Sequence, residues 1–379
     1  MKKVLTRCLF CTFLLCFFAL PCAAQEATLV TDELQTQYAT FLESIPPEVA
    51  ELLPEAFFSA SPEVGGDALE KAGGIRAVMQ ALSKITGLAI RENLALLANI
   101  CGILLLTAVF RAMGGKGEGV GKAYSFCTTL ATTVLLLGLQ AQKLSKLEAF
   151  FNTVKALCAA LLPMMGTLYA MGGNLRRAVV NHSTLSFFLS VLETLCAGTV
   201  LPIAGICLAF ALLDAVTGRG NLRGVAGVIK RSYTLMISFL MGIFCFVLGT
   251  QSALAKASDT LALRTARFAA GSFLPLVGGS VSETLRTVAG SVEYLRATVG
   301  TGAILVLFFA FLPTFLSVLL TRIALMLGGA VAGLLSCESE GRVLGELSSV
   351  YGYFLATISV LFVALTFSLT LFAQCAAAG

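Results

Sequence analysis

The stretch FLPLVGGSVSETLRTVAGSVEYLRATVG, residues 273–300, decides how the rest of this chain is organised. It opens with an apolar run around Pro275, which has no amide hydrogen, and two glycines then loosen the backbone. Ser280 is a candidate helix N-cap, and Glu283 three residues later completes a capping box. The pattern therefore predicts a helix that begins near Ser280 and ends at Gly300.

The predicted helix has one apolar face and one charged face. Its apolar side chains recur at spacings of three and four, as on one side of an α-helix: Val281, Leu285, Val288, Val292, Leu295 and Val299. The other face carries Glu283, Arg286, Glu293 and Arg296. Such a helix should lie on a membrane surface or pack along a partner helix. We expect a partner-docking motif made of Phe273, Pro275, Gly278, Gly279, Leu285, Val288, Val292 and Leu295.

Composition places the chain in a membrane. Of its 379 residues, 57% are hydrophobic and only 12% are charged, and the mean hydropathy is +0.90. Charged residues make up about a quarter of a typical globular chain. The apolar runs are continuous and about 20 residues long, which fits helices and not alternating strands. We therefore predict an all-α, polytopic membrane protein with the lipid bilayer as its first partner.

The N-terminal region has the pattern of an exported segment. Residues 1–24 combine basic residues, an apolar core and a small-residue cleavage site, as in a signal peptide, although a lipoprotein signal or an uncleaved anchor fits too. Residues 25–93 are acidic, and prolines and glycines divide them into short helical pieces. From Ile75 a second amphipathic helix is expected on the outer membrane face, with the stripe Val78, Met79, Leu82, Ile85 and Leu88.

Residues 94–379 form the predicted multi-span domain. The 302–335 run is too long for one straight crossing, so Pro313 and Arg322 suggest either a kinked span or a hairpin. The apolar runs cover residues 94–113, 123–139, 154–172, 185–213, 233–254, 302–335 and 352–373.

Two Leu-Pro-x-x-Gly sequences suggest an internal repeat. They contain Pro163 and Pro275, and each is followed at a similar distance by a second Leu-Pro pair, at Pro202 and at Pro313. The suspected repeats are residues 154–254 and 268–373. Repeats with broken or re-entrant helices form the central site of many transporters. The sequence leaves open whether 154–172 and 268–284 span or re-enter the membrane, and on which side the C-terminus lies.

Catalytic chemistry has little support in the sequence. The glycine-rich residues 115–122 lack the first glycine and the final hydroxyl of a phosphate loop. The single histidine, His182, has no cluster of metal-ligating residues beside it, and the cysteines show no disulfide or zinc spacing. We expect no catalytic, cofactor-binding or metal-ligating residue. Basic residues beside membrane segments indicate contact with lipid heads and give no reason to expect nucleic acid.

Charged residues inside apolar runs are the remaining candidates for a site. Glu193, Lys155 and Arg322 lie in such runs, where charge is costly and often functional. We predict that they contribute to a polar path between the repeats. In the structural alternative, Lys155 reaches toward the membrane surface, Glu193 caps a shorter span and Arg322 marks the tip of a hairpin.

With these residues laid out, the chain resembles the stage III sporulation protein AE family of endospore-forming bacteria. The resemblance covers most of the chain and is strongest at residues 273–279, at Ser282, Glu283 and Thr287, and at 299–300. Glu283 stands where the family is expected to have Asp, and residues 337–340 do not match the family pattern.

The resemblance implies a non-enzymatic subunit in the mother-cell membrane that surrounds the forespore. This subunit would belong to a secretion-like channel complex between mother cell and forespore, needed for forespore development. Implied partners are other stage III sporulation membrane proteins, a secretion-type ATPase and ring-forming proteins. The alternative is a secondary transporter that uses the interface between the repeats as its substrate path. What is translocated, and in what stoichiometry, stays open.

Overall fold

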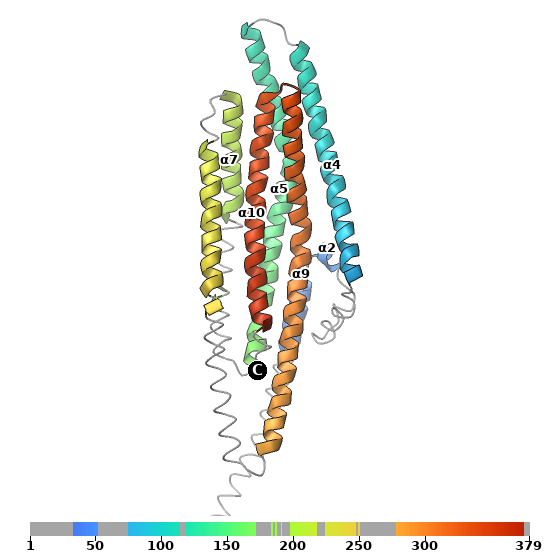
Figure 1. Ribbon diagram of the computed structural model, residues 1–379, viewed down its shortest axis with the longest axis vertical. Helices are drawn as coiled ribbons and strands as arrows, with labels where there is room; N and C mark the ends of the chain where they lie inside the picture. The colour runs from blue at the N-terminus through green and yellow to red at the C-terminus, as the bar shows by residue number, and fades with distance from the viewer. Residues whose placement is uncertain are drawn as a thin grey trace, which may run out of the picture.

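The computed structural model describes residues 33–51, 75–113, 118–171, 198–217, 224–247 and 278–374, with a few isolated positions between 183 and 250. Within these residues the regular structure is all helical, as predicted. The helices are one over 33–43, α2 (Pro47–Ala50), α4 (Ile75–Met113), α5 (Glu118–Met171), α7 (Gly198–Thr217), the helix Gly224–Val247, α9 (Gly278–Leu334) and α10 (Glu338–Gln374). They lie side by side in an elongated bundle (Figure 1).

Five helices of the described residues are long and apolar enough to cross a membrane. This supports a polytopic helical membrane protein. The apolar segments are Ser83–Ala112, Phe126–Leu168, Gly224–Val247, Gly302–Leu334 and Glu338–Thr370, and a shorter apolar helix covers Gly198–Phe210.

A tight turn joins α9 to α10 at the end of the bundle where α4 meets α5 (Figure 1). The Cys337 amide donates to the Ala332 carbonyl at 2.8 Å, and the Ser336 amide donates to Gly333 at 3.3 Å. This pair of bonds is a Schellman motif, which usually places glycine in the left-handed position. Here Ser336 occupies it, with φ of 55°. The turn therefore ends α9 sharply and sends α10 back along it.

α5 corrects the expected division of residues 123–172 into two spans. It is one uninterrupted helix of 54 residues, about 81 Å long at 1.5 Å per residue. Residues 140–155, expected to be a loop in an arrangement where every apolar run crosses the membrane, are helical. Pro163 lies inside the helix without breaking it, so no re-entrant turn is present at 154–171. The Lys, Gln, Glu, Leu and Ala residues of 140–155 favour a helix, although the charged and amide side chains among them are unfavourable in lipid.

α9 corrects the expected end of the organising helix. It runs for 57 residues through Gly300, which is buried together with Val299, and continues into the 302–334 segment. A helical glycine costs about 1 kcal/mol, which packing on both sides outweighs. A helix continuous with a span cannot lie flat on the membrane surface. Of the two expected placements of this helix, the one on the membrane surface is therefore wrong. The 302–335 run is no hairpin, and Arg322 lies within α9 and not at a tip.

The second amphipathic helix is likewise continuous with the first span. α4 joins residues 75–93 to 94–113 in one helix of 39 residues, so it too does not lie flat on the membrane. Of the expected stripe, Ile85 packs partly against the core whereas Leu88 is 66% exposed, and the buried apolar side chains of α4 are Ala89, Leu96, Ile100 and Leu104. The internal repeat stays a prediction, and the signal segment 1–24 lies outside the described residues.

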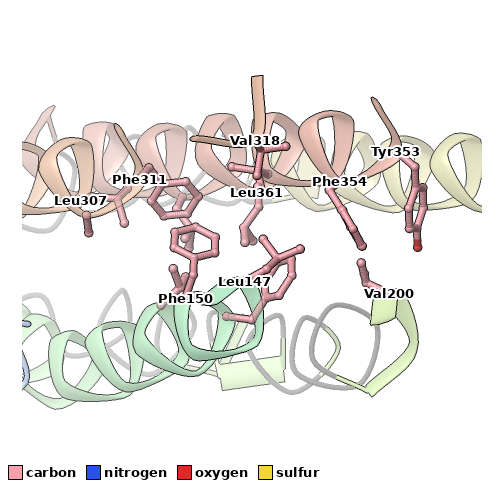
Figure 2. Packing of buried hydrophobic residues seen from close by; sticks show 14 of the residues in the cluster. Leu147, Phe150, Val200, Leu307, Phe311, Val318, Tyr353, Phe354 and Leu361 are labelled. Carbon is pink, nitrogen blue, oxygen red and sulfur yellow. The ribbon is translucent and has the colours of Figure 1, made fainter. Parts of the chain in front are cut away.

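A single hydrophobic cluster runs through the bundle. In Figure 2, Phe150 of α5 points toward Phe311 of α9, and their rings meet edge to face with the centroids 4.9 Å apart. The N-terminal helix belongs to the same cluster through Leu34, Tyr38 and Phe41. Burial raises the pKa of Tyr38 to about 12.

The N-terminal helix contacts the far end of α5. The Thr167 hydroxyl donates to Gln37 Oε1 at 2.5 Å. The predicted break at the prolines is present, because the 33–43 helix ends before Pro46 and α2 begins at Pro47. The segment expected to be exported thus packs on the end of α5 that lies opposite the Schellman turn (Figure 1).

Candidate functional site

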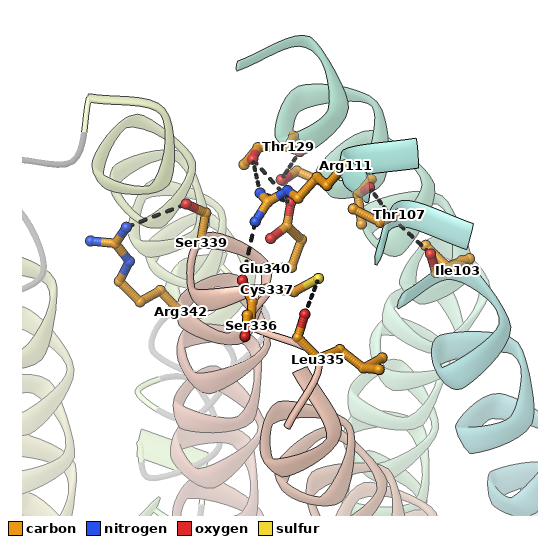
Figure 3. Close-up of polar contacts among 12 residues, drawn as sticks. Ile103, Thr107, Arg111, Thr129, Leu335, Ser336, Cys337, Ser339, Glu340 and Arg342 are labelled. Atoms are coloured by element: carbon orange, nitrogen blue, oxygen red, sulfur yellow. Dashed lines mark hydrogen bonds and ion pairs between the residues drawn. The ribbon is translucent and has the colours of Figure 1, made fainter. Parts of the chain in front are cut away.

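A cluster around Arg111 joins α4, α5 and α10 at the turn end of the bundle (Figure 3). Arg111 Nη2 lies 2.7 Å from Glu340 Oε1 and donates to Thr129 Oγ1 at 3.1 Å. The Thr129 hydroxyl donates to the same Glu340 oxygen at 3.0 Å. Glu340 is fully buried. A buried carboxylate of this kind needs both its cation and its hydrogen bonds, because desolvation of a lone charge costs several kcal/mol.

Cys337 lies beside this cluster and outside the apolar helical segments. Its Sγ contacts the Leu335 carbonyl oxygen at 3.5 Å. Burial raises the pKa of the Cys337 thiol, and the Glu340 carboxylate raises it further, while the Arg111 guanidinium acts in the opposite direction. The thiol is therefore held neutral at physiological pH and behaves as a buried packing group.

A second ion pair joins the helix Gly224–Val247 to α10. Lys230 Nζ lies 3.1 Å from Glu346 Oε2 and donates to Ser349 Oγ at 2.7 Å. Lys230 and Glu346 are both buried. Tyr351 follows Glu346 on the same helix, α10, and its hydroxyl donates to Gln140 Oε1 of α5 at 2.7 Å.

A third group, the Lys143 cluster, joins α4, α5 and α9. Lys143 Nζ donates to Asn93 Oδ1 and to Thr321 Oγ1, both at 2.8 Å. The Thr321 hydroxyl donates to Asn93 Oδ1 at 2.7 Å, and the Asn93 amide donates to the Ala89 carbonyl at 2.8 Å. Each of the three helices thus contributes one polar side chain to a closed network.

Both apolar and polar side chains lie between the Arg111 cluster and the Lys143 cluster, the polar ones being Thr107, Thr132, Thr133 and Gln140. Ile100, Leu104, Leu136 and Leu344 lie between them along their helices and are completely buried. Within the part of the chain that the structure describes, Glu340 Oε2 and Gln140 Nε2 are buried without a hydrogen-bond partner. The three polar groups, around Arg111, Lys230 and Lys143, fix the register of neighbouring helices.

The predicted polar-path residues are not gathered in one place. Lys155 is exposed on α5. Arg322 lies on α9 against Gly352 of α10, where an added Cβ would meet the guanidinium carbon at 3.1 Å. Glu193, Phe273 and Pro275 lie outside the described residues.

The docking motif can be placed only in part. Gly278 and Gly279 begin α9, and the backbone of the segment with Leu285, Val288, Val292 and Leu295 is helical. The side chains of that segment lie outside the description. The polar path and the docking face therefore stay predictions.

Sequence reasoning missed the clustered residues for identifiable reasons. Asn93, Gln140 and Lys143 fall where the apolar runs end, so the sequence predicts loops or flanks for them. Thr129, Thr133 and Gln140 recur at helical spacing on one face of α5, which is a signal that could have been used once 118–171 is read as one helix. Glu340 stands out in the sequence only as a departure from the family pattern.

No group of three His, Cys, Asp or Glu side chains is placed to share a metal ion within the described ranges. What those ranges do contain is a bundle of long apolar helices, held in register by buried polar contacts, which defines a multi-pass helical membrane protein.

The comparison with protein families identifies it further. The model for "Stage III sporulation protein AE" matches residues 69–378, and the chain belongs to that family. Membership implies a role in sporulation. The chain is 25% identical over 149 residues to the stage III sporulation protein AE of Bacillus subtilis (strain 168). That match covers 39% of this chain and 37% of the relative. No solved structure matches the chain.

Proposed function

We propose that this chain is a non-catalytic membrane subunit of the channel complex that links the mother cell to the engulfed forespore. The observation that carries the proposal is the family match over residues 69–378. The geometry supports it, because the buried polar side chains of the described residues contact neighbouring helices and maintain the bundle. Such a bundle suits a rigid subunit of a larger assembly.

The proposal includes a location and partners. The chain sits in the mother-cell membrane around the forespore and assembles with other stage III sporulation membrane proteins, a secretion-type ATPase and ring-forming proteins. If residues 25–93 are exported, the helix 33–43, which contacts α5 through Gln37 and Thr167, occupies a position from which a partner outside the cytoplasm can be reached.

Deletion of the gene in its host tests the role. Vegetative growth should stay normal, and sporulation should stop after the forespore is engulfed. Expression of the chain from a second locus should restore heat-resistant spores. A deletion strain that forms heat-resistant spores at the normal yield contradicts the proposal.

A reconstitution separates the subunit from a secondary transporter. The purified chain alone in liposomes should carry no substrate-dependent flux, whereas the chain captured from sporulating cells should bring the other membrane proteins of the complex with it. Flux by the chain alone, without its partners, would instead favour the transporter.

A further inference from the structure

The outer surface of α5 is polar along residues 141–159. The inner side of this stretch packs on the core through Leu147 and Phe150, which are buried. Its exposed residues, here called the polar face, are all polar or alanine, whereas Leu130 and Val134 earlier on the same helix are large, apolar and exposed. At 1.5 Å per residue the stretch is about 28 Å long, close to the thickness of about 30 Å of a bilayer's hydrocarbon core. The polar face consists of Ala141, Gln142, Ser145, Lys146, Glu148, Ala149, Asn152, Lys155, Ala156 and Ala159.

Two contacts show which part of the bundle lies at the level of the polar face. The Tyr351 hydroxyl of α10 donates to Gln140 at the start of this stretch, at 2.7 Å. Further along α5, the ring of Phe150 meets Phe311 of α9, and Phe311 meets Phe362 of α10 with the ring centroids 5.3 Å apart. The part of α5 between these two contacts therefore lies at the level of the part of α10 between Tyr351 and Phe362.

At this level another face of the bundle is apolar. The helix Gly224–Val247, yellow at the left edge of Figure 1, lines an open groove through Met241 and Cys245, together with Val360 and Ala364 of α10. The large side chains exposed around this groove are apolar. In a chain whose described residues include five helices able to cross a membrane, a surface of this kind suits contact with acyl chains. This apolar face consists of Phe239, Ile243, Phe246, Val363 and Phe367.

The polar face cannot share these surroundings. Lys146, Glu148 and Lys155 carry charges, which are costly among acyl chains and which membrane helices usually turn toward protein or a water-filled cavity. A dry protein contact is unfavourable too, because Glu148 has no hydrogen bond or ion pair within the described residues and would be buried uncompensated. The amide groups of Gln142 and Asn152 would likewise need new partners in a dry contact. Water is the surrounding that satisfies all of these side chains.

We propose that the polar face of α5, residues 141–159, lines a water-filled path within the membrane, while the apolar face at the same level meets lipid. The adjoining surface of α4 is mixed, since Leu88 is exposed beside Arg91 and Glu92, and Glu92 lies 3.5 Å from Lys146. α4 therefore forms an edge of the path. Because the exposed charges have both signs, the path suits hydrophilic solutes of either charge. One bundle supplies one wall, so the inference rests on the proposed function for the neighbouring subunits that complete it.

Labelling of single cysteines by a charged, membrane-impermeant maleimide compares the two faces at one level. Ala149→Cys and Asn152→Cys report on the polar face, and Ile243→Cys and Val363→Cys are the matched controls on the apolar face, all in a cysteine-depleted chain. All four side chains are exposed, so burial in the protein does not distinguish the two sets. The membranes come from sporulating cells and are made permeable, so that the reagent reaches both aqueous sides. The first pair should react as fast as in detergent. The second pair should react about a hundredfold slower than in detergent, because lipid excludes charge by about that factor.

Folding is checked by recovery of each variant at the wild-type level in the membrane fraction, and Ser145→Cys and Phe246→Cys replace any variant that is not recovered. Slow labelling of all four cysteines would show that protein or lipid covers the polar face, and fast labelling of all four would place the whole level in water. Either result overturns the proposal. Slow labelling of Asn152→Cys in a chain that restores heat-resistant spores overturns the water-filled path and leaves the subunit role intact. Normal spore formation without the gene contradicts the subunit role and leaves the labelling contrast unaffected.

Discussion

Lys230 and Glu346 face each other inside the bundle, with Nζ and Oε2 3.1 Å apart and both side chains buried. They join the helix Gly224–Val247 to α10, where Lys230 also donates to the Ser349 hydroxyl. Each charge of this pair compensates the other, since neither side chain can reach bulk water.

Replacement of one partner should therefore harm the bundle more than replacement of both. Lys230→Met or Glu346→Met leaves an uncompensated buried charge and should cost about 3–5 kcal/mol. The double variant removes both charges and should be more stable than the less stable of the two single variants. Denaturant unfolding of the purified protein in detergent measures all three. The exposed pair Lys146 and Glu92 is the control, where Gln substitutions should change stability by about 0–1 kcal/mol.

Gly328 and Gly333, both on α9, should respond oppositely to alanine. A Cβ at Gly328 would meet Ile100 Cγ2 of α4 at 2.7 Å, and this stiff branched side chain cannot rotate away. Gly328→Ala should cost about 1–3 kcal/mol. At Gly333 nothing lies within 4 Å, so Gly333→Ala should be neutral or stabilise by up to about 1 kcal/mol. The thermal midpoints in detergent report the difference. Equal effects of the two substitutions would show that α4 and α9 are not in close contact at this level.

Cys337 should be slow to react with thiolate-directed reagents. Because burial raises its pKa, little thiolate exists at pH 8, and alkylation should accelerate only at higher pH. The same chain unfolded in detergent, with an ordinary cysteine pKa of about 8.5, is the reference. The folded state keeps a proton that the unfolded chain releases, so this thiol should make stability fall as the pH rises above about 8.5. Equal alkylation rates in folded and unfolded chains would contradict the assignment.

The apolar face of the organising helix can be tested by two double substitutions. Leu285→Asp with Leu295→Asp places charges on a face that must be covered, because each large side chain left in water forfeits about 1.5–3 kcal/mol. This pair should abolish spore formation and capture of partner proteins. Arg286→Gln with Glu293→Gln, on the other face, should have little effect. If the Gln pair does as much harm as the Asp pair, the charged face is the one that makes contact.

Glu193 tests the predicted polar path. Glu193→Gln should reduce spore yield while the protein level and membrane insertion stay normal, because only the charge is removed. Glu193→Leu is the companion variant. Normal spore formation by both would show that the chain merely tolerates a carboxylate there.

The fold class followed from composition, but the lengths of the helices did not. Pro163 and Gly300 are residues that end helices in most sequences, yet both lie inside helices longer than 50 residues. Pro163 removes one backbone hydrogen bond from its helix, and Gly300 costs about 1 kcal/mol of helix stability. Packing against neighbouring helices contributes more stability than either residue removes. Local sequence patterns cannot predict that the helices continue through these residues, because the compensating contacts come from distant parts of the chain.

The same limit explains the buried clusters. Lys143 looks like a loop residue until Asn93 and Thr321 are known to lie beside it, 50 and 178 residues away in the sequence. Arg322 was identified as unusual from sequence alone, since it lies in an apolar run. Its neighbour, Gly352 on α10, could not be inferred, because a glycine gives no sign of what packs against it.

Pro313 is a position at which α9 can bend. Its missing amide hydrogen removes one hydrogen bond from a helix that is held by Thr321 eight residues further on. The segment from Gly278 to Pro313 is about 52 Å long, and a bend of about 5° at the proline would move its tip by about 5 Å. Because Val299, Val306 and Phe311 of this segment are buried against neighbouring helices, such a bend has to move those helices as well, and a force on the Gly278 end is passed to them.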